Sequence, residues 1–385
     1  MSVETVSLGC RLNFAEAETI ARSAPAGEHW VVVNSCAVTN EAVRQTRQAI
    51  RHAHRRHPDA RILVTGCAAE LDRRSFELMP EVARVVGNAD KLSVFDVKTP
   101  VVAAGTHSHV RSFVAVQNGC DHRCTFCSIW QARGQSVSLP FEAIRDAVSR
   151  EIDRGAKEIV LTGVDITDYD GGLGTLCQRL LAAEPRLTRL RLSSLDSIEI
   201  DDAVFELLSD ERLMPHFHLS LQAGDDMILK RMKRRHSRAQ AVATVAKIKT
   251  ARPDATIGAD LIAGFPTETE EMAANSLKLL DDCDIIAAHI FPFSPRPNTP
   301  AAHMPQLDRE LVKARAARLR EAAQKRRQRW LDSLVGSVQP VLMENGGKGH
   351  SDSFAPVRIA ASGRGDLIRA RITARDGDHL GGARA

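Results

Sequence analysis

The sequence lacks the features that would place it in a membrane. None of the apolar runs in its 385 residues approaches the ~18 residues that a transmembrane helix needs. The first ten residues have neither the basic stretch nor the apolar core of a signal peptide. We therefore expect a soluble, cytoplasmic protein that has no membrane partner.

The sequence also lacks a strong charge imbalance. A net charge of +4 is too small to establish a nucleic-acid partner by itself. Basic residues are clustered instead, in the ranges 42–58, 230–235 and 309–329. Arg44, Arg47, Arg51 and Arg55 recur at helical spacing, which is typical either of a solvated helix face or of an RNA contact. Both interpretations stay open, and nothing in the pattern points to DNA.

Disulfide bonds are not expected, because the cytosol is reducing. The eight cysteines are therefore better interpreted as metal ligands or catalytic groups wherever they cluster. They occupy positions 10, 36, 67, 120, 124, 127, 177 and 283. Cys177 and Cys283 fall inside predicted helices, where a buried small side chain is the expected role. The fourteen histidines form no H-E-x-x-H motif.

The first hundred residues repeat one unit of strand, loop and helix, which predicts a parallel sheet. The strands are expected at 4–8, 30–34, 61–65 and 84–87, and the helices at 13–22, 40–57 and 71–78. Cys10, Cys36 and Cys67 each follow one of the first three strands. Because the carboxyl ends of parallel strands lie at one edge, these cysteines are predicted to meet there. The alternative is three small buried residues at turns.

Longer strand–helix units follow a candidate linker at 99–110. Six strands predict a partial or complete α/β barrel. They are expected at 113–117, 158–162, 190–193, 217–221, 256–262 and 285–291. Thr267 and Glu270 have the spacing of a capping box, so a helix is expected from there to about Leu280.

The last fifty residues change in character. Short β-prone runs at 338–343, 356–360 and 367–373 are separated by Gly, Asp and Ser, which indicates a small all-β barrel. A helix from Asp308 to about Leu334 is expected to connect it to the centre. The predicted fold is α/β, with a Rossmann-like domain at 1–98, a partial (β/α)6 barrel with its connecting helix at 106–334, and the β barrel at 335–385.

Three further cysteines form the strongest motif in the chain. Cys120, Cys124 and Cys127 have the spacing C-x3-C-x2-C and follow a predicted strand. A 4Fe–4S cluster needs four ligands, so three thiolates leave one iron open, as in reactive metal sites. A zinc site that borrows Cys177 or a histidine is the alternative.

With this motif the sequence resembles the radical S-adenosylmethionine superfamily, and its methylthiotransferase family in particular. The segments that carry the resemblance are 7–13, 34–39, 158–165, 191–195, 218–222, 258–268 and 289–296. The C-terminal segment resembles the RNA-binding TRAM domain of that family. Together these segments span nearly the whole chain.

The resemblance implies two 4Fe–4S clusters, one held by Cys120, Cys124 and Cys127 and a second by Cys10, Cys36 and Cys67. It also implies S-adenosylmethionine as methyl donor and radical source. Matching motifs give the expected cofactor contacts, which are Phe126, Gly163, Asp165, Ser194 and Gln222. A sulfur donor and an electron donor are implied as further partners.

In the implied reaction, one S-adenosylmethionine methylates sulfur on the N-terminal cluster, and another gives the radical that removes hydrogen from adenine C2. The segment 9–13 (GCRLN) most resembles the branch that acts on N6-threonylcarbamoyladenosine at position 37 of tRNA. The isopentenyladenosine branch more often has Gln-Met there, and the ribosomal-protein branch Pro-Lys. Methylthiolation of either of those substrates, a non-catalytic tRNA-binding protein and an electron carrier remain as alternatives.

Overall fold

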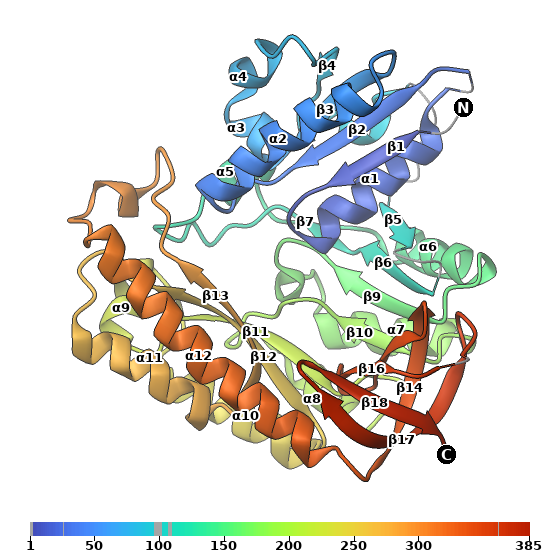
Figure 1. The fold of residues 1–385 in the computed structure, drawn as a ribbon, viewed down its shortest axis with the longest axis vertical. Helices are drawn as coiled ribbons and strands as arrows, with labels where there is room; N and C mark the ends of the chain where they lie inside the picture. The colour runs from blue at the N-terminus through green and yellow to red at the C-terminus, as the bar shows by residue number, and fades with distance from the viewer. Residues whose placement is uncertain (1–2, 26, 96–101, 107–109, 361) are drawn as a thin grey trace.

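The computed structural model describes residues 3–25, 27–95, 102–106, 110–360 and 362–385. Figure 1 shows an N-terminal sheet with its helices, a larger central α/β unit and a small C-terminal barrel on the opposite side of that unit from the N-terminal sheet. The described helices include none that is long and apolar enough to cross a membrane. The predicted α/β fold class is confirmed.

The N-terminal sheet is parallel, in the order β1-β2-β3-β4. β2 is buried along its whole length, as expected of a parallel strand covered on both faces. The helix predicted at 71–78 is instead two short helices that meet at Asp72, whose φ of −142° is not helical. The elements are β1 (Glu4–Ser7), α1 (Arg11–Ser23), β2 (Trp30–Ser35), α2 (Asn40–Arg56), β3 (Arg61–Gly66), α3 (Cys67–Leu71), α4 (Arg73–Glu77), β4 (Arg84–Val85) and η1 (Lys91–Ser93).

The central unit has six parallel strands, as predicted. β10, β9 and β6 form one sheet and β11, β12 and β13 another, and isolated bridges from Leu190 to Leu213 and from Leu195 to Leu219 join them. Among the described residues β6 and β13 do not pair, so the barrel is partial. The strands are β6 (Arg111–Ala115), β9 (Glu158–Thr162), β10 (Leu190–Leu192), β11 (His216–Gln222), β12 (Thr256–Ala263) and β13 (Ile285–Pro292).

Short strands and covering helices complete this unit, which β5 extends antiparallel to β6. They are β5 (Ala104–Thr106), β7 (Gln117–Asn118), α5 (Ile129–Arg133), β8 (Val137–Ser138), α6 (Phe141–Asp153), η2 (Ile166–Asp168), α7 (Leu173–Ala183), α8 (Asp202–Leu207), α9 (Asp226–Met232), α10 (Arg238–Ala251), α11 (Glu270–Asp282) and η3 (Pro300–His303).

Two local expectations are wrong. The candidate linker at 99–110 contains β5, although 99–101 and 107–109 lie outside the described residues. The cap of α11 is Thr269, whose hydroxyl accepts from the backbone N–H of Met272, rather than Thr267. Thr267 has a φ of +67°, in the left-handed region that a helix N-cap does not use.

The six central strands have an apolar outer face and a polar inner face. Val114, Leu161, Leu219 and Leu261 belong to one large buried cluster with the covering helices. Side chains alternate along a strand, so the intervening residues face the interior of the partial barrel, which we call the lumen. These lumen residues include Arg111, Phe113, Glu158, Arg191, His216, His218 and Asp260.

The C-terminal segment forms a closed barrel of five strands, where the sequence pattern indicates three. The long helix α12 (Arg309–Ser333) packs along β13 and leads into it, as expected. Its strands are β14 (Val338–Asn345), β15 (Lys348–Ser351), β16 (Pro356–Arg358), β17 (Leu367–Asp376) and β18 (His379–Arg384). A TRAM-like domain is consistent with this closed barrel.

A loop of the C-terminal barrel closes the lumen at the amino ends of the central strands. The Phe354 ring stacks on His216, which begins β11, with ring centroids 5.4 Å apart. The same ring lies under the guanidinium groups of Arg111 and Arg191, at 5.1 and 4.9 Å from its centroid. Arg191 also donates to the backbone carbonyl oxygens of Ser351 (3.1 Å) and Asp352 (2.9 Å).

One buried carboxylate forms ion pairs with these two arginines and with a third. Glu158 is fully buried and pairs with Arg111, with Arg191 at 2.9 Å and with Arg189 at 3.1 Å. Burial opposes its ionisation, yet the three guanidinium groups hold the pKa of Glu158 far below its usual range. Glu158 therefore links the central strands to the loop that closes them.

We predict that Glu158→Gln lowers the free energy of unfolding by about 3–5 kcal/mol, because it removes the carboxylate that three buried guanidinium groups share and leaves Arg191 without an anion, although Arg111 and Arg189 keep Glu344 and Asp352. Denaturant unfolding at pH 7 measures this. The matched control is Glu142→Gln, which removes an exposed carboxylate paired with Arg145 and should leave the free energy of unfolding nearly unchanged, because water screens an exposed pair. Equal losses in the two variants would contradict the role given to Glu158.

Candidate iron–sulfur and substrate site

The N-terminal cysteines lie together at the carboxyl edge of the parallel sheet, as predicted. Cys10 caps α1, and its sulfur accepts from the backbone N–H of Asn13 at 3.4 Å. Cys36 follows β2 directly, and Cys67 follows β3 as the first residue of α3. The three thiols lie close enough for their charges to interact.

Gly9 is required by this arrangement. Its φ of +94° favours glycine, and a Cβ at this position would lie 2.7 Å from the Cys36 sulfur. A larger residue would therefore displace Cys36 from the edge where the three cysteines meet.

The second cysteine group lies on one loop between β7 and α5. The backbone N–H of Cys120 donates to Gly134 and that of Thr125 to Met232, which fixes both ends of the loop. A Cβ on Gly119 would come within 1.7 Å of the Gln135 carbonyl oxygen, so only glycine fits before Cys120. Cys120, Cys124 and Cys127 also lie within electrostatic range of one another.

Arg133 connects the two cysteine groups. It ends α5, six residues after Cys127, and its Nε donates to the Cys67 sulfur at 3.3 Å. Its Nη1 also donates to Glu16 at 2.7 Å, and its Nη2 to the Asn13 side chain at 2.5 Å. Cys127 of one group and Cys67 of the other also lie close enough for their charges to interact. The two groups therefore face a common region.

Lys91 completes this buried cluster. Its Nζ lies 2.5 Å from Glu16 Oε2, and both side chains are almost fully buried. Burial opposes ionisation, but the charges of Arg133 and Lys91 lower the pKa of Glu16 to about 2. The carboxylate is therefore ionised at neutral pH.

Desolvation dominates the chemistry of the thiols. Burial raises the pKa of Cys36 and of Cys127 to about 11, and that of Cys120 to about 12. Without a bound cation these groups are neutral thiols at pH 7. Binding of a cationic centre must therefore release protons.

The spacing of the sulfur atoms tests which metal centre fits. Tetrahedral zinc with Zn–S bonds of ~2.3 Å holds its sulfur ligands about 3.8 Å apart. Among the described residues, the groups of three ligand atoms that lie within 4.8 Å of one another include neither cysteine triad. Each triad is thus wider than a zinc site, and it offers only sulfur ligands, as an iron–sulfur cubane requires.

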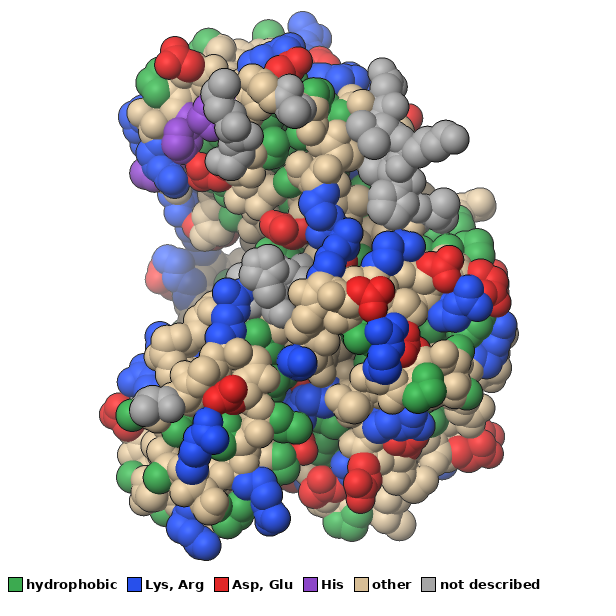
Figure 2. Space-filling model, turned by 90° about the vertical axis from the view of Figure 1, so that its right-hand side faces the viewer, with side chains coloured by type: hydrophobic (Ala, Val, Ile, Leu, Met, Phe, Trp, Pro, Cys, Tyr) green, Lys and Arg blue, Asp and Glu red, His purple; other side chains and the backbone are tan. Residues whose placement is uncertain are grey.

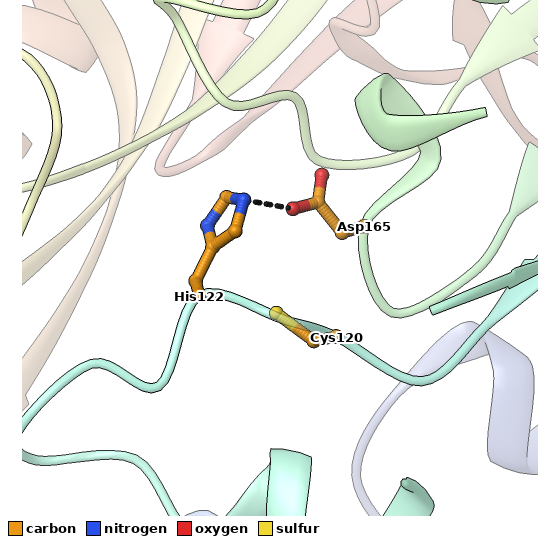
Figure 3. Close-up of side chains that lie close together, drawn as sticks. All are labelled: Cys120, His122 and Asp165. Carbon is orange, nitrogen blue, oxygen red and sulfur yellow. Dashed lines mark ion pairs between the residues drawn. The ribbon is translucent and has the colours of Figure 1, made fainter. Parts of the chain in front are cut away.

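A histidine–carboxylate network lies beside Cys120. Figure 3 shows the His122 ring directed at Asp165, with an Nε2–Oδ2 distance of 3.1 Å. Ligand atoms of Cys120, His122 and Asp165 lie within 4.8 Å of one another. Burial lowers the pKa of His122, but Glu199 and Asp165 outweigh it and raise that pKa overall.

Arg234 approaches the same loop from the central barrel. It belongs to the basic run 230–235, and its guanidinium lies 3.7 Å from the Cys124 sulfur and 2.8 Å from Asp196. The sequence pattern indicates neither this contact nor the roles of His122 and Arg133. A basic residue within a charged run, or one beside a motif cysteine, is the only signal that the sequence offers.

The predicted cofactor contacts differ in how they relate to this loop. Asp165 is buried beside His122, and Gly163 lies where a Cβ would come within 2.8 Å of the Gln117 carbonyl oxygen. Phe126 packs on an apolar cluster that contains Ile262 and Phe265. Ser194 is exposed and Gln222 ends β11 with a φ of +68°. Within the described residues, no hydrogen bond joins Ser194 or Gln222 to the cysteine loop.

Comparison with known proteins agrees with this geometry. A family model described as "Radical SAM superfamily" matches residues 114–280, and one described as "Uncharacterized protein family UPF0004" matches residues 2–87. The threonylcarbamoyladenosine tRNA methylthiotransferase of Rickettsia prowazekii is 42% identical over 92% of this chain and 91% of its own length. The chain belongs to the radical SAM methylthiotransferase family.

A second relative of this methylthiotransferase is the tRNA-2-methylthio-N6-dimethylallyladenosine synthase of Erythrobacter litoralis. It is 31% identical over 89% of this chain and 86% of its own length. A solved radical S-adenosylmethionine methyltransferase from Kitasatospora setae shares the fold, with a TM-score of 0.54 and 14% identity over 71% of this chain and 65% of that one.

Family membership confirms that the chain is an enzyme and that its cofactors are 4Fe–4S clusters and S-adenosylmethionine. The cysteines fit these cofactors in ligand type, since each triad offers three sulfur atoms. Cys177 and Cys283 are buried in the apolar core, as predicted, and are not part of either triad.

The pKa of Glu16 gives a testable pH dependence. In the unfolded chain a glutamate titrates near 4.3, above its folded pKa of about 2. Its ionisation therefore stabilises the fold fully above about pH 4.3, and this contribution is lost as the pH falls toward 2. The gap in unfolding free energy between the wild type and Glu16→Gln should narrow by about 1.4 kcal/mol per pH unit below pH 4.

Urea unfolding from pH 7 to pH 3, on protein that has not yet been reconstituted with iron, measures this gap. Glu77→Gln serves as the control, because its pair with Arg73 is exposed and screened by water. A gap for Glu16→Gln that stays constant over the whole range would show that Glu16 is not an ionised partner of Arg133.

Proposed function

We propose that this enzyme installs a methylthio group on C2 of N6-threonylcarbamoyladenosine at position 37 of tRNA, with two 4Fe–4S clusters. The observation that carries the proposal is the pair of separate cysteine triads that face each other through Arg133, which touches Cys67 and lies close behind Cys127. The threonylcarbamoyl substrate is supported by the relative that is 42% identical and by the segment 9–13.

In this proposal each triad holds one cluster. Cys120, Cys124 and Cys127 hold the cluster that works with S-adenosylmethionine, and Cys10, Cys36 and Cys67 hold the cluster that carries sulfur. When bound, these groups supply the radical, the sulfur and the methyl group. We further propose 1–98, 106–334 and 335–385 as domains, with 104–105 joining the central one because β5 pairs with β6.

The protein side chains bind and orient the reactants. Asp165, fixed by His122 and by the hydroxyl of Thr167 at 2.6 Å, offers a carboxylate at the mouth of the cysteine loop. Gly163 permits close approach to the backbone there, and Phe126 offers an apolar wall. We assign these three residues, with Ser194 and Gln222, to S-adenosylmethionine. Arg133 and Arg234 place positive charge beside the sulfur atoms of Cys67 and Cys124.

Binding of tRNA is assigned to exposed arginines. Arg369 and Arg371 point outward from β17, because Ile368, Ala370 and Ile372 are buried. Neither forms an ion pair within the described residues, whereas Arg44, Arg47 and Arg51 on α2 each face an acidic side chain. The helical arginine stripe is therefore mainly a solvated, paired face. Figure 2 shows Lys and Arg interspersed with Asp and Glu on one face of the molecule.

Single substitutions distinguish the functions of the two cysteine triads. Cys36→Ala should abolish methylthio product but retain reductive cleavage of S-adenosylmethionine to 5′-deoxyadenosine, because the other triad is intact. Cys127→Ala should abolish deoxyadenosine formation. Each variant should hold about four irons where the wild type holds about eight. Cys283→Ala, a buried cysteine outside both triads, is the matched control and should resemble the wild type.

Chromatography of both products from one anaerobic reaction with threonylcarbamoylated tRNA, together with iron analysis, reads out all three variants. Normal methylthio product from Cys36→Ala would overturn the two-cluster proposal. A wild type that binds tRNA but never cleaves S-adenosylmethionine would favour a non-catalytic tRNA-binding protein.

The proposed tRNA contact predicts a change in salt dependence. The double variant Arg369→Ala, Arg371→Ala should bind tRNA more weakly, and its plot of log affinity against log salt should be shallower by about 1 for each phosphate that the protein no longer neutralises. Filter binding at several salt concentrations measures both quantities. The control is Arg44→Ala, whose guanidinium pairs with Glu41 and which should bind as the wild type does. An unchanged slope in the double variant would exclude β17 from the interface.

A further inference from the structure

Arg11 places in the lumen a positive charge that forms no ion pair with any residue that the structure describes. It is the first residue of α1, directly after Cys10, and its guanidinium reaches over the ring of Phe113 on β6, 5.9 Å from the ring centroid. The side chain is half-buried. Within the described residues it forms no hydrogen bond or ion pair, whereas Arg133 makes several.

The anions near Arg11 are already occupied. Its charge interacts at longer range with Asp260 and Glu158. Asp260 accepts from His218 at 2.9 Å and from His289 at 3.1 Å, and Glu158 is held by three other arginines. Arg111 and His216 add further cationic or polar groups around it. A desolvated guanidinium in such surroundings gains most from an anion that arrives with the substrate.

The position of Arg11 fits the substrate of the proposed function. Adenine C2 and C6 flank the same ring nitrogen, so a base that presents C2 to the N-terminal cysteines carries its N6 group within a side-chain length of them. The threonylcarbamoyl group ends in a carboxylate, whereas the dimethylallyl group is entirely apolar. A guanidinium beside Cys10 is therefore within reach of the one feature that separates the two substrates.

We propose that Arg11 selects the substrate by binding the carboxylate of the threonyl group through a charge-assisted, bidentate contact. This inference rests on the proposed function and deepens it. An apolar N6 group would leave the guanidinium desolvated and unpaired, and sites built to hydrogen-bond a substrate group reject analogues that lack it far more strongly than apolar pockets reject a hydroxyl. Selection thus comes from the cost that the wrong substrate imposes as well as from the contact with the right one.

The test uses the reconstituted enzyme and anticodon stem-loop RNA that carries either threonylcarbamoyladenosine or its carboxyl methyl ester. The ester removes the negative charge and leaves the rest of the group in place. Wild type should bind the acid about 10- to 100-fold more tightly than the ester, the range of one charge-assisted contact. Arg11→Gln should bind both forms equally, with the loss confined to the acid, and Arg11→Lys should keep part of the preference.

Each other outcome has a distinct meaning. Equal weakening of acid and ester in Arg11→Gln would overturn the proposal, since it would show that Arg11 binds an RNA phosphate or only supports the fold. A wild type without preference for the acid, or a variant that keeps that preference, would overturn it as well. Iron content and Tm report whether the variant is folded, and Arg44→Gln is the matched control for removal of one arginine.

Failure of the proposed function itself is separable from failure of this inference. A wild type that binds the acid selectively but forms no methylthio product from it would remove the proposed reaction. The binding comparison between the acid and the ester needs no turnover, so it would still decide whether Arg11 recognises the carboxylate.

Discussion

The geometry of the site depends on one buried ionic cluster, in which Glu16 accepts from both Arg133 and Lys91. Glu16 lies on the helix that begins after Cys10, and Arg133 on the helix that follows Cys127. A buried ion pair adds little net stability compared with apolar packing, but it tolerates few arrangements. The rigid guanidinium fork therefore sets how the N-terminal sheet sits on the barrel, and with it how the two cysteine triads face each other.

The same arginine also takes part in the electrostatics of the sulfur ligands. Arg133 donates to Cys67, and Arg234 lies beside Cys124, so each triad has a guanidinium group next to one of its sulfur atoms. Burial alone would keep thiols protonated, as it does at Cys177, whose pKa is raised and which has no cation beside it. Burial raises the pKa of Cys36, Cys120 and Cys127 as well, so what sets the six cysteines of the two triads apart from Cys177 and Cys283 is their clustering.

The sequence is sufficient wherever the information is local or periodic. Strand–helix alternation predicts the parallel sheets, and the positions of Cys10, Cys36 and Cys67 after three strands predict that they meet. The sequence does not predict which residues meet through tertiary contacts. Nothing local distinguishes Arg234 from its neighbours in a basic run, yet it is Arg234 whose guanidinium lies against a cysteine sulfur. The capping error at α11 has a similar origin, because Thr267 and Thr269 are both plausible caps and the backbone conformation chooses between them.

The C-terminal barrel is a structural part of the catalytic unit as well as the assigned RNA-binding module. Its Phe354 ring and the backbone of Ser351 and Asp352 close the lumen at the amino ends of the central strands, and Arg189 and Arg191 tie that loop to Glu158. Removal of the whole segment would open the lumen and take away the partners of Arg189 and Arg191 at Ser351 and Asp352, so a resulting decrease in tRNA affinity could not be ascribed to the RNA interface alone. The outward face of β17 is chemically separate from this closure. Only substitutions there can separate RNA binding from the integrity of the lumen.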